Sequence, residues 1–222
     1  MDKEQPNEVQ LRATDLGVDG EHGPLFQGID LEIDAGLHAV QMPAGQEQNA
    51  LLLTLAGRLR PSHGTVDVLG ATTPGAIRRH CAVAAFEGID DLDDSVTVDT
   101  VLAEQRRWLA PWYSMVPLSA GRLELDEVFG PLDRPQPKTR IGQLTDLQLF
   151  LLRITLALLG NRPILIVGDL EQVRDNPGRA DAVQRLGAIA SRYTVIVGVT
   201  NPLGGIAPDH VHHDRLALTR KD

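Results

Sequence analysis

Short alternating segments separated by turn residues open the chain. Residues 9–11 and 29–33 alternate between apolar and polar side chains, and Gly20, Gly23 and Pro24 lie between them. An alternation of period two on both sides of glycines predicts an antiparallel β-meander, because successive side chains of a strand point to opposite faces. We therefore expect an antiparallel sheet at the N-terminal side of the fold.

The rest of the chain alternates between continuous apolar runs and stretches with helical periodicity. Leucines at three- and four-residue spacing predict helices, and short runs that are entirely apolar predict strands buried on both faces. The predicted strands cover residues 38–41, 65–69, 82–86, 164–167, 194–199 and 215–219, and the predicted helices cover residues 48–59, 98–108, 145–159 and 179–192. Helices that alternate with buried strands indicate an α/β fold with a largely parallel sheet.

The region between residues 95 and 144 breaks this alternation. Five prolines follow its one predicted helix, and proline is unfavourable inside helices and central strands. We therefore expect one domain over residues 1–222, with a helical subdomain at about 95–160 inserted in the α/β core.

Composition excludes several classes of protein. The chain has 222 residues, 42% of them hydrophobic, which is enough for a buried core. Its formal charge of −9 argues against nucleic-acid binding, because an acidic surface repels phosphate backbones. The polar residues 1–10 are unlike a signal peptide, the apolar stretch 149–159 is too short to span a bilayer, and the single cysteine, Cys81, suits a reducing compartment. We expect a cytoplasmic protein that reaches a membrane only through a partner.

A loop between a predicted strand and a predicted helix has the geometry that cradles phosphate groups. It reads Met-Pro-Ala-Gly-Gln-Glu-Gln-Asn-Ala over residues 42–50. The run Leu-Ala-Gly-Arg-Leu-Arg-Pro-Ser-His-Gly over residues 55–64 resembles the nucleotide-binding domains of ABC transporters, and the order of elements agrees with this resemblance over residues 9–219. The resemblance implies an ABC-type P-loop NTPase-like α/β fold with an N-terminal antiparallel β-subdomain and a small helical subdomain.

The same resemblance places unusual residues in the phosphate-binding loop. Gln48 falls at the position of the family's lysine and Glu47 at the glycine before it, while Asn49 and Ala50 replace the serine and threonine that follow and Gly45 remains. A P-loop needs its lysine for the β- and γ-phosphates and a hydroxyl for magnesium. Glu47 would add a repulsion of roughly 4 kcal/mol, for like charges about 4 Å apart at an effective dielectric of about 20. We expect a vestigial P-loop that binds ATP poorly.

Three further nucleotide-contacting positions of the family are altered. The aromatic residue that stacks on adenine falls near Gly20, the glutamine that senses magnesium falls at Glu87, and the switch histidine falls at Asn201. None of these three residues has the side chain that the family uses at its position. The resemblance therefore implies no working adenine, magnesium or γ-phosphate contact at these places.

The family's two catalytic acids also lack a full match. The magnesium-binding aspartate and the catalytic glutamate fall at Gly168 and Asp169, and with one residue gapped Asp169 takes the place of the magnesium-binding aspartate instead. The loop aspartate further on falls at Asp175. We expect no catalytic residue, no bound metal and no cofactor, with Asp169, Asn201 and Glu87 as degenerate equivalents.

The family's signature segment, Leu-Ser-Gly-Gly-Gln, appears as Leu144, Thr145, Asp146, Leu147 and Gln148. Threonine followed three residues later by glutamine is also typical of a capping box at the start of a helix. We prefer this structural interpretation. Asp146 would in addition point an acid at any γ-phosphate that a partner domain offers.

Two surface features are candidate docking sites for a membrane partner. In ABC transporters, the ATP-binding domain receives a cytoplasmic helix of the membrane subunit in a cleft beside its helical subdomain. The corresponding region of this chain carries an acidic run over residues 87–94 and aromatic residues in the helical subdomain. The docking residues we predict are Glu87, Asp91, Asp93, Asp94, Trp108 and Trp112. A solvated acidic loop, which also includes Asp90, and aromatic core residues are the simpler interpretations.

These observations favour a subunit that resembles an ABC transporter ATP-binding protein, has a degenerate nucleotide site, and serves as a structural or regulatory partner of an integral membrane protein at the inner face of the membrane. It would act as a homodimer or as a heterodimer with another ABC domain. One alternative is an ATP-binding subunit that binds ATP with magnesium and hydrolyses the ATP together with an intact partner. Another is an ABC-like protein without a transporter. A metal site in residues 209–214, which contain three histidines, is the weakest hypothesis.

Overall fold

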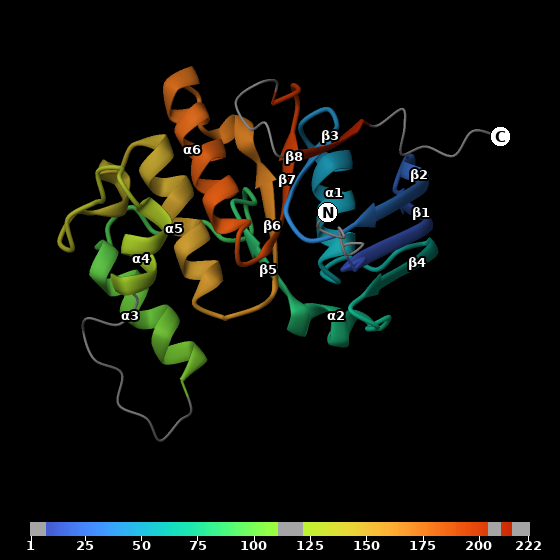
Figure 1. The fold of residues 1–222 in the computed structure, drawn as a ribbon, viewed down its shortest axis with the longest axis horizontal. Coiled ribbons are helices and arrows are strands. Elements are labelled where there is room, and N and C mark those ends of the chain that lie inside the picture. The colour runs from blue at the N-terminus through green and yellow to red at the C-terminus, as the bar shows by residue number, and fades with distance from the viewer. Residues whose placement is uncertain (1–7, 111–121, 204–209, 215–222) are drawn as a thin grey trace, which may run out of the picture.

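Two sheets, six α-helices and two short 3-10 helices form the part of the chain that the structure, a computed structural model, describes: residues 8–110, 122–203 and 210–214 (Figure 1). A three-stranded antiparallel sheet has the order β2-β1-β4, and a five-stranded parallel sheet has the order β5-β6-β7-β3-β8. The antiparallel strands are β1 (Leu11–Gly20), β2 (Gly23–Ile33) and β4 (His63–Val68). The parallel strands are β3 (Leu37–Gln41), β5 (Cys81–Ala84), β6 (Ile164–Asp169), β7 (Thr194–Val199) and β8 (His210–Asp214).

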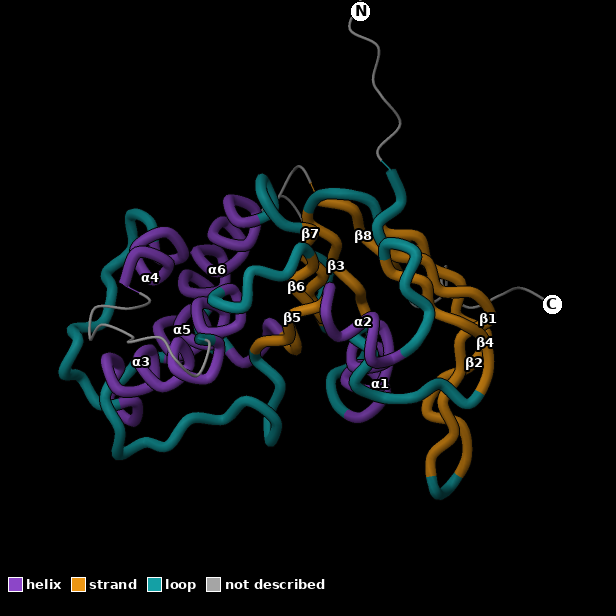
Figure 2. Tube along the Cα trace, turned by 90° about the horizontal axis from the view of Figure 1, so that it is seen from below, coloured by secondary structure: helices purple, strands orange, loops and turns teal. Residues whose placement is uncertain are grey.

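The helices lie on both sides of the parallel sheet. They are α1 (Gln46–Leu55), α2 (Pro74–His80), α3 (Val98–Leu109), α4 (Arg122–Phe129), α5 (Asp146–Leu158) and α6 (Asn176–Ile189). Helices α3 to α6 gather on one side, whereas α1 lies between the parallel and the antiparallel sheet (Figures 1 and 2). No helix in the described ranges is long and apolar enough to cross a membrane.

The parallel sheet separates two apolar cores, and its central strands supply both of them. Leu165 and Val167 of β6 pack with the helices α3 to α6, while Ile164 and Ile166 pack with α1 and the antiparallel sheet. This arrangement explains why residues 164–167 are entirely apolar, since a strand covered on both faces has no solvent-facing side chains. The predicted α/β fold is confirmed.

Several predicted boundaries differ from the structure for local reasons. The helix predicted over 48–59 ends at Leu55, because Gly57 adopts a φ of 67°. The strand predicted over 82–86 ends at Ala84, because Ala85 turns to a φ of 60°. The sequence did not predict α2, α4 or β8, and the strand predicted over 215–219 lies outside the described residues.

A pair of imidazoles joins β3 to the edge strand β8. Nδ1 of His38 lies 3.0 Å from Nε2 of His213, and the two rings stack with their centroids 5.3 Å apart. Nε2 of His38 lies 3.1 Å from both the carbonyl and a carboxylate oxygen of Asp34. Since both oxygens only accept, Nε2 of His38 carries the proton and Nδ1 accepts one from His213. Both rings are neutral in this arrangement, and no group of three metal-ligating side chains occurs among the residues that the structure describes.

We expect this pair to make the fold sensitive to acid. Burial lowers the pKa of His38. Burial, and then the proximity of the ionisable rings of His38 and His212, lowers the pKa of His213 to about 4. Because both folded pKa values lie below the unfolded value of about 6.5, the stabilisation is complete above pH 6.5 and is lost as the pH falls towards 4. The urea concentration at which half of the protein is unfolded should therefore decrease when the pH is lowered from 7 to 5. His213→Gln should flatten this dependence, and His63→Gln, at an exposed histidine, should leave it unchanged; equal slopes in all three proteins would contradict the assignment.

Candidate functional site

The loop between β3 and α1 places a neutral amide where the resemblance puts the lysine. Gln48 is fully buried, and its Nε2 donates to the carbonyl of Met42 at 3.1 Å and to that of Val199 at 3.2 Å. The amide thus ties the end of β3 to the end of β7, which are the carboxyl ends of neighbouring parallel strands. Its Oε1 packs against Gly198 and accepts no hydrogen bond from the described residues. A group that neutralises phosphate charge is absent at this position, because an amide carries no charge.

The other residues of this loop offer little to an anion. Gly45 has a φ of 120° and begins α1 without a side-chain cap. Glu47 is half-buried in the first turn of α1, where the partial positive charge of a helix N-terminus favours a carboxylate. Asn49 is half-buried and Ala50 is buried, so that no hydroxyl follows Gln48. A negative side chain of the protein itself therefore lies in the first turn of the helix that follows the loop.

The end of β6 has no room for a side chain at position 168. A Cβ atom on Gly168 would lie 2.1 Å from the carbonyl oxygen of Ala85, on the adjoining strand connection. The register between β6 and β7 is irregular at this point, because Val167 pairs with Val197 and Asp169 already pairs with Gly198. In the ungapped alignment, Gly168 stands at the position of the family's metal-binding aspartate. The backbone of Ala85 packs so closely against Gly168 that no aspartate side chain fits there.

Asp169 is engaged in local structure. It caps the short 3-10 helix over Leu170–Gln172, and its Oδ1 accepts a hydrogen bond of 2.9 Å from the backbone N–H of Glu171. Burial raises the pKa of Asp169, and the charge of Glu171 adds to this effect. The carboxylate of Glu171 in turn binds Arg179 at 2.9 Å and accepts a hydrogen bond from Nδ2 of Asn201 at 3.2 Å. Asn201, which falls at the position of the family's switch histidine, is therefore held by Glu171, a partner that the sequence did not predict.

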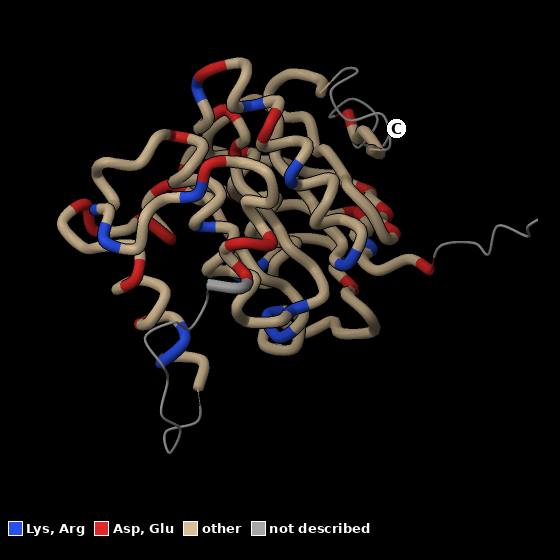
Figure 3. Tube along the Cα trace, turned by 60° about the vertical axis from the view of Figure 1, so that its left-hand side comes forward, with Lys and Arg blue, Asp and Glu red and all other residues tan. Residues whose placement is uncertain are grey.

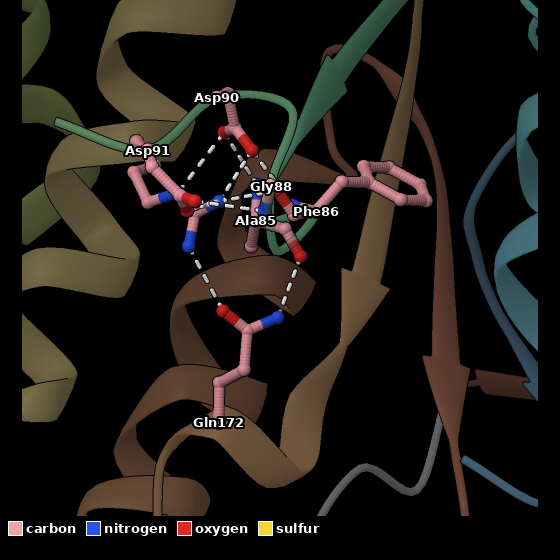
Figure 4. Close-up of polar contacts among 7 residues, drawn as sticks. Ala85, Phe86, Gly88, Asp90, Asp91 and Gln172 are labelled. Atoms are coloured by element: carbon pink, nitrogen blue, oxygen red, sulfur yellow. Dashed lines mark hydrogen bonds and ion pairs between the residues drawn. The ribbon is translucent and has the colours of Figure 1, made fainter. Parts of the chain in front are cut away.

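A buried ionic network joins the loop after β5 to α5 (Figure 4). Arg153 is 6% exposed, and its guanidinium binds the carboxylate of Asp90, the carbonyl of Phe86 at 2.7 Å and Oε1 of Gln172 at 2.9 Å. The same Asp90 accepts hydrogen bonds from the backbone N–H groups of Ala85 and Phe86 at 2.8 and 2.7 Å. The interpretation of Asp90 as part of a solvated acidic loop is wrong, because its carboxylate is paired with a buried arginine.

The other acidic residues of this loop remain at the surface. Glu87, Asp91, Asp93 and Asp94 are exposed. Asp91 accepts a hydrogen bond from the N–H of Gly88 at 2.8 Å and lies 3.4 Å from Arg153. Asp93 accepts from both the hydroxyl and the N–H of Ser95, and these bonds lower its pKa. These carboxylates are accessible from solvent.

Trp108, the predicted aromatic docking residue that the structure describes, does not adjoin the acidic run. Trp108 is 86% exposed in the last turn of α3, and Trp112 lies outside the described residues. The acidic run precedes the first turn of α3, about 15 Å away along the helix axis at 1.5 Å per residue. The structure therefore places Trp108 and the acidic run at opposite ends of one helix.

The signature-like segment forms the predicted capping box. Oγ1 of Thr145 accepts a hydrogen bond from the N–H of Gln148 at 3.1 Å, and Oε1 of Gln148 accepts one from the N–H of Thr145 at 3.2 Å. Loss of such a cap typically costs about 1 kcal/mol. Asp146 is partly exposed and pairs with Arg174 at 3.7 Å, while Leu144 and Leu147 pack against the helical core.

Two further positions named by the resemblance have structural roles. Asp175 caps α6 by accepting a hydrogen bond of 2.7 Å from the N–H of Gly178. Gly20 ends β1 at the hairpin and pairs with Gly23. With Asp175 as its N-cap, α6 begins at Asn176, which is three residues before the predicted start at residue 179.

Comparisons with known proteins agree with this architecture. No protein-family profile matches the chain. The cytochrome c biogenesis ATP-binding export protein CcmA of Cupriavidus pinatubonensis is 34% identical over 91 residues, which are 40% of this chain and 40% of that protein. The chain thus matches less than half of this curated relative.

Solved structures superpose on nearly the whole chain. A Pyrococcus furiosus protein described as an ABC transporter ATP-binding protein has a TM-score of 0.73 at 18% identity, over 95% of this chain and 99% of that one. The ATP-binding cassette MJ0796, solved as a dimer with ADP and phosphate, has a TM-score of 0.70 at 16% identity, over 89% and 90%. CbiO1 of Clostridium perfringens, part of the transporter complex cbiONQ, has a TM-score of 0.67 at 16% identity, over 87% and 79%. The chain therefore has the α/β fold of the ATP-binding domains of ABC transporters.

Proposed function

We propose that this chain is an ABC-type subunit whose nucleotide site has been dismantled and which serves as a structural or regulatory partner of a membrane protein. The observation that carries the proposal is the buried amide of Gln48, which ties the ends of β3 and β7 together in place of a phosphate-binding lysine. The absence of room for a side chain at Gly168 supports it independently. We infer that these residues do not fit a magnesium–nucleotide complex.

We propose a membrane partner on two grounds, which are the exposed carboxylates of the acidic run and the descriptions of two similar proteins. CbiO1 is described as part of a transporter complex, and CcmA as an export protein. The exposed carboxylates of Asp91, Asp93 and Asp94 suit a basic cytoplasmic loop of an integral membrane protein. In this proposal the chain binds at the inner face of the membrane, as a homodimer or paired with another ABC domain, and its helical subdomain at about 95–160 takes part in docking.

Calorimetric titration tests the nucleotide part of the proposal. We expect ATP with magnesium to bind with a dissociation constant in the millimolar range or weaker, because the loop supplies no cation at position 48 and no hydroxyl at position 49 or 50. Gln48→Lys alone should not restore micromolar binding, since Gly168 offers no magnesium ligand and the carboxylate of Asp169 already caps the 3-10 helix that follows β6. Micromolar binding by the wild-type protein would overturn the proposal and would favour the alternative, in which the chain binds ATP and hydrolyses it with an intact partner subunit.

The docking part has a separate test. Co-purification from solubilised membranes, followed by mass spectrometry, should recover an integral membrane protein with the wild-type chain. The triple variant Asp91→Asn, Asp93→Asn, Asp94→Asn should recover less of it, and the salt dependence of binding should weaken. Equal recovery by both proteins at every salt concentration would remove this acidic run from the interface.

A further inference from the structure

A cluster of arginines lies at the edge of the parallel sheet opposite the loop of Gln48. Arg58 follows α1, Arg78 lies in the last turn of α2, and Arg162 precedes β6. The blue segments near the lower edge of Figure 3 include α2. Because α1 starts at the carboxyl edge of the sheet and ends here, this cluster is separate from the candidate nucleotide site.

The arginines of this cluster have no acidic partner in the described part of the chain. Nη1 of Arg78 donates to the carbonyl of Gly57 at 3.1 Å, and Nη1 of Arg162 donates to that of Cys81 at 3.1 Å. Ion pairs hold many other arginines of this acidic chain, but none joins Arg58, Arg78 or Arg162 to a carboxylate within the described residues; the paired arginines include Arg12, Arg106, Arg134, Arg153, Arg174, Arg179 and Arg192. Each guanidinium has five N–H donors, so most donors of the cluster remain available.

The local fold holds these charges together against their repulsion. Gly57 adopts a φ of 67°, and a Cβ atom there would lie 2.9 Å from Ile77 and from the carbonyl of Pro74. Only glycine therefore lets α2 pack on the end of α1 and bring Arg78 to its carbonyl. The contacts bring the three residues together, because Arg78 reaches the carbonyl of Gly57, next to Arg58, and Arg162 reaches the carbonyl of Cys81, whose Sγ lies 4.0 Å from the carbonyl oxygen of Leu55. In agreement with this, partial burial and then the charges of Arg162 and Arg78 lower the pKa of Arg58.

A cavity lies next to the cluster, because the chain neighbours of two cluster residues line it: Gly57 and Leu59 flank Arg58, and Ile77 precedes Arg78, whereas the three arginines themselves are not part of its lining. It has a volume of about 310 Å³, and Gly57 and Arg60 line it together with hydroxyl-bearing and apolar side chains. Thr65, Thr72 and Thr73 are among its polar lining residues. Threonine hydroxyls donate readily to phosphate oxygens, and the space exceeds what one bare anion needs.

We propose that Arg58, Arg78 and Arg162 form an oxyanion site that binds a phosphate group, with the adjoining cavity receiving the remainder of the ligand. Guanidinium groups match phosphate geometry through paired N–H donors. A bound phosphate would offset the repulsion among the three arginines. The phosphate belongs either to a small soluble molecule or to a phospholipid headgroup, and the site does not depend on the proposed function.

Thermal unfolding in inorganic pyrophosphate tests the soluble source. Pyrophosphate at low millimolar concentration should raise the melting temperature of the wild-type protein relative to chloride of equal ionic strength, because a ligand that binds only the native state stabilises it. Arg58→Gln and Arg162→Gln should each weaken the apparent affinity about fivefold, the effect of one exposed ion pair. Arg107→Gln is the matched control, since it removes an exposed arginine charge from α3, and it should respond as the wild type does.

Flotation with vesicles of phosphatidylglycerol and phosphatidylcholine tests the lipid source. Vesicle binding that falls in Arg58→Gln and Arg162→Gln but not in Arg107→Gln would assign the site to a headgroup. Arg60→Gln, at the rim of the cavity, gives a second measurement if either variant fails to fold. The proposal is overturned if neither pyrophosphate nor vesicles bind, or if the cluster variants bind both as strongly as Arg107→Gln does.

Discussion

Arg153→Met is expected to lower the free energy of unfolding by about 3–5 kcal/mol, because removing one partner of a buried ion pair leaves the other charge without compensation. The guanidinium is 6% exposed, and it binds Asp90 as well as the carbonyl of Phe86 and the amide of Gln172. All of these groups would lose a charged donor at once. Urea unfolding followed by circular dichroism measures the change.

A surface arginine provides the matched control for this variant. Arg174 is 86% exposed and pairs with Asp146 at 3.7 Å, so that Arg174→Met should cost no more than about 1 kcal/mol. In a double-mutant cycle, Asp90→Asn should cost little more once Arg153 has been removed, since the two act as one unit. If Arg153→Met proves no more harmful than Arg174→Met, the network does not hold the loop after β5 in place.

Gly168→Ala is expected to destabilise the fold by about 1–3 kcal/mol or more, the usual cost of forcing atoms into a packed interior. The added methyl group would lie 2.1 Å from the carbonyl oxygen of Ala85, so one of the two backbones must move. Gly168→Asp should cost more, because it also buries a carboxylate beside a carbonyl oxygen. Thermal and urea unfolding measure both variants.

Gly187→Ala is the control for this pair, because it also adds a methyl group to a glycine. Gly187 lies in α6, and a Cβ atom there meets nothing within 4 Å. It should therefore gain stability, by up to about 1 kcal/mol from helix propensity. A stable Gly168→Asp protein that binds magnesium–ATP would show that the site can be rebuilt by one substitution, which contradicts the proposed dismantling.

The sequence predicted the elements whose patterns are local. Residues 164–167 and 194–199 are entirely apolar because both faces of their strands are buried, and α5 begins where its capping box predicts. The elements that it missed lack such patterns. Helix α2 buries only Ile77, and β8 is a polar segment that is a strand because it extends the edge of β3.

The sequence predicted which residues belong to the candidate site, but it did not predict which residues contact them. The resemblance pointed to Gln48 and Gly168, yet the contacts that define their roles come from Val199 and Ala85, far away in the chain. Arg153 could be recognised as a charge in an apolar helix, but its pairing with Asp90 spans 63 residues. Long-range contacts of this kind leave no periodic signal, because only the folded backbone brings the partners together.

The position of β3 in its sheet has a consequence for synthesis. Both hydrogen-bonded neighbours of this strand, β7 and β8, come from residues 194–214, whereas β3 itself ends at Gln41. At ribosomal rates of 5–20 residues per second, roughly 150 further residues take on the order of 8–30 s to emerge. Throughout that time the nascent chain carries an apolar strand with two open edges, which is a template for aggregation. Productive biogenesis of this chain should therefore depend on ribosome-associated chaperones, and slow translation should lower its soluble yield.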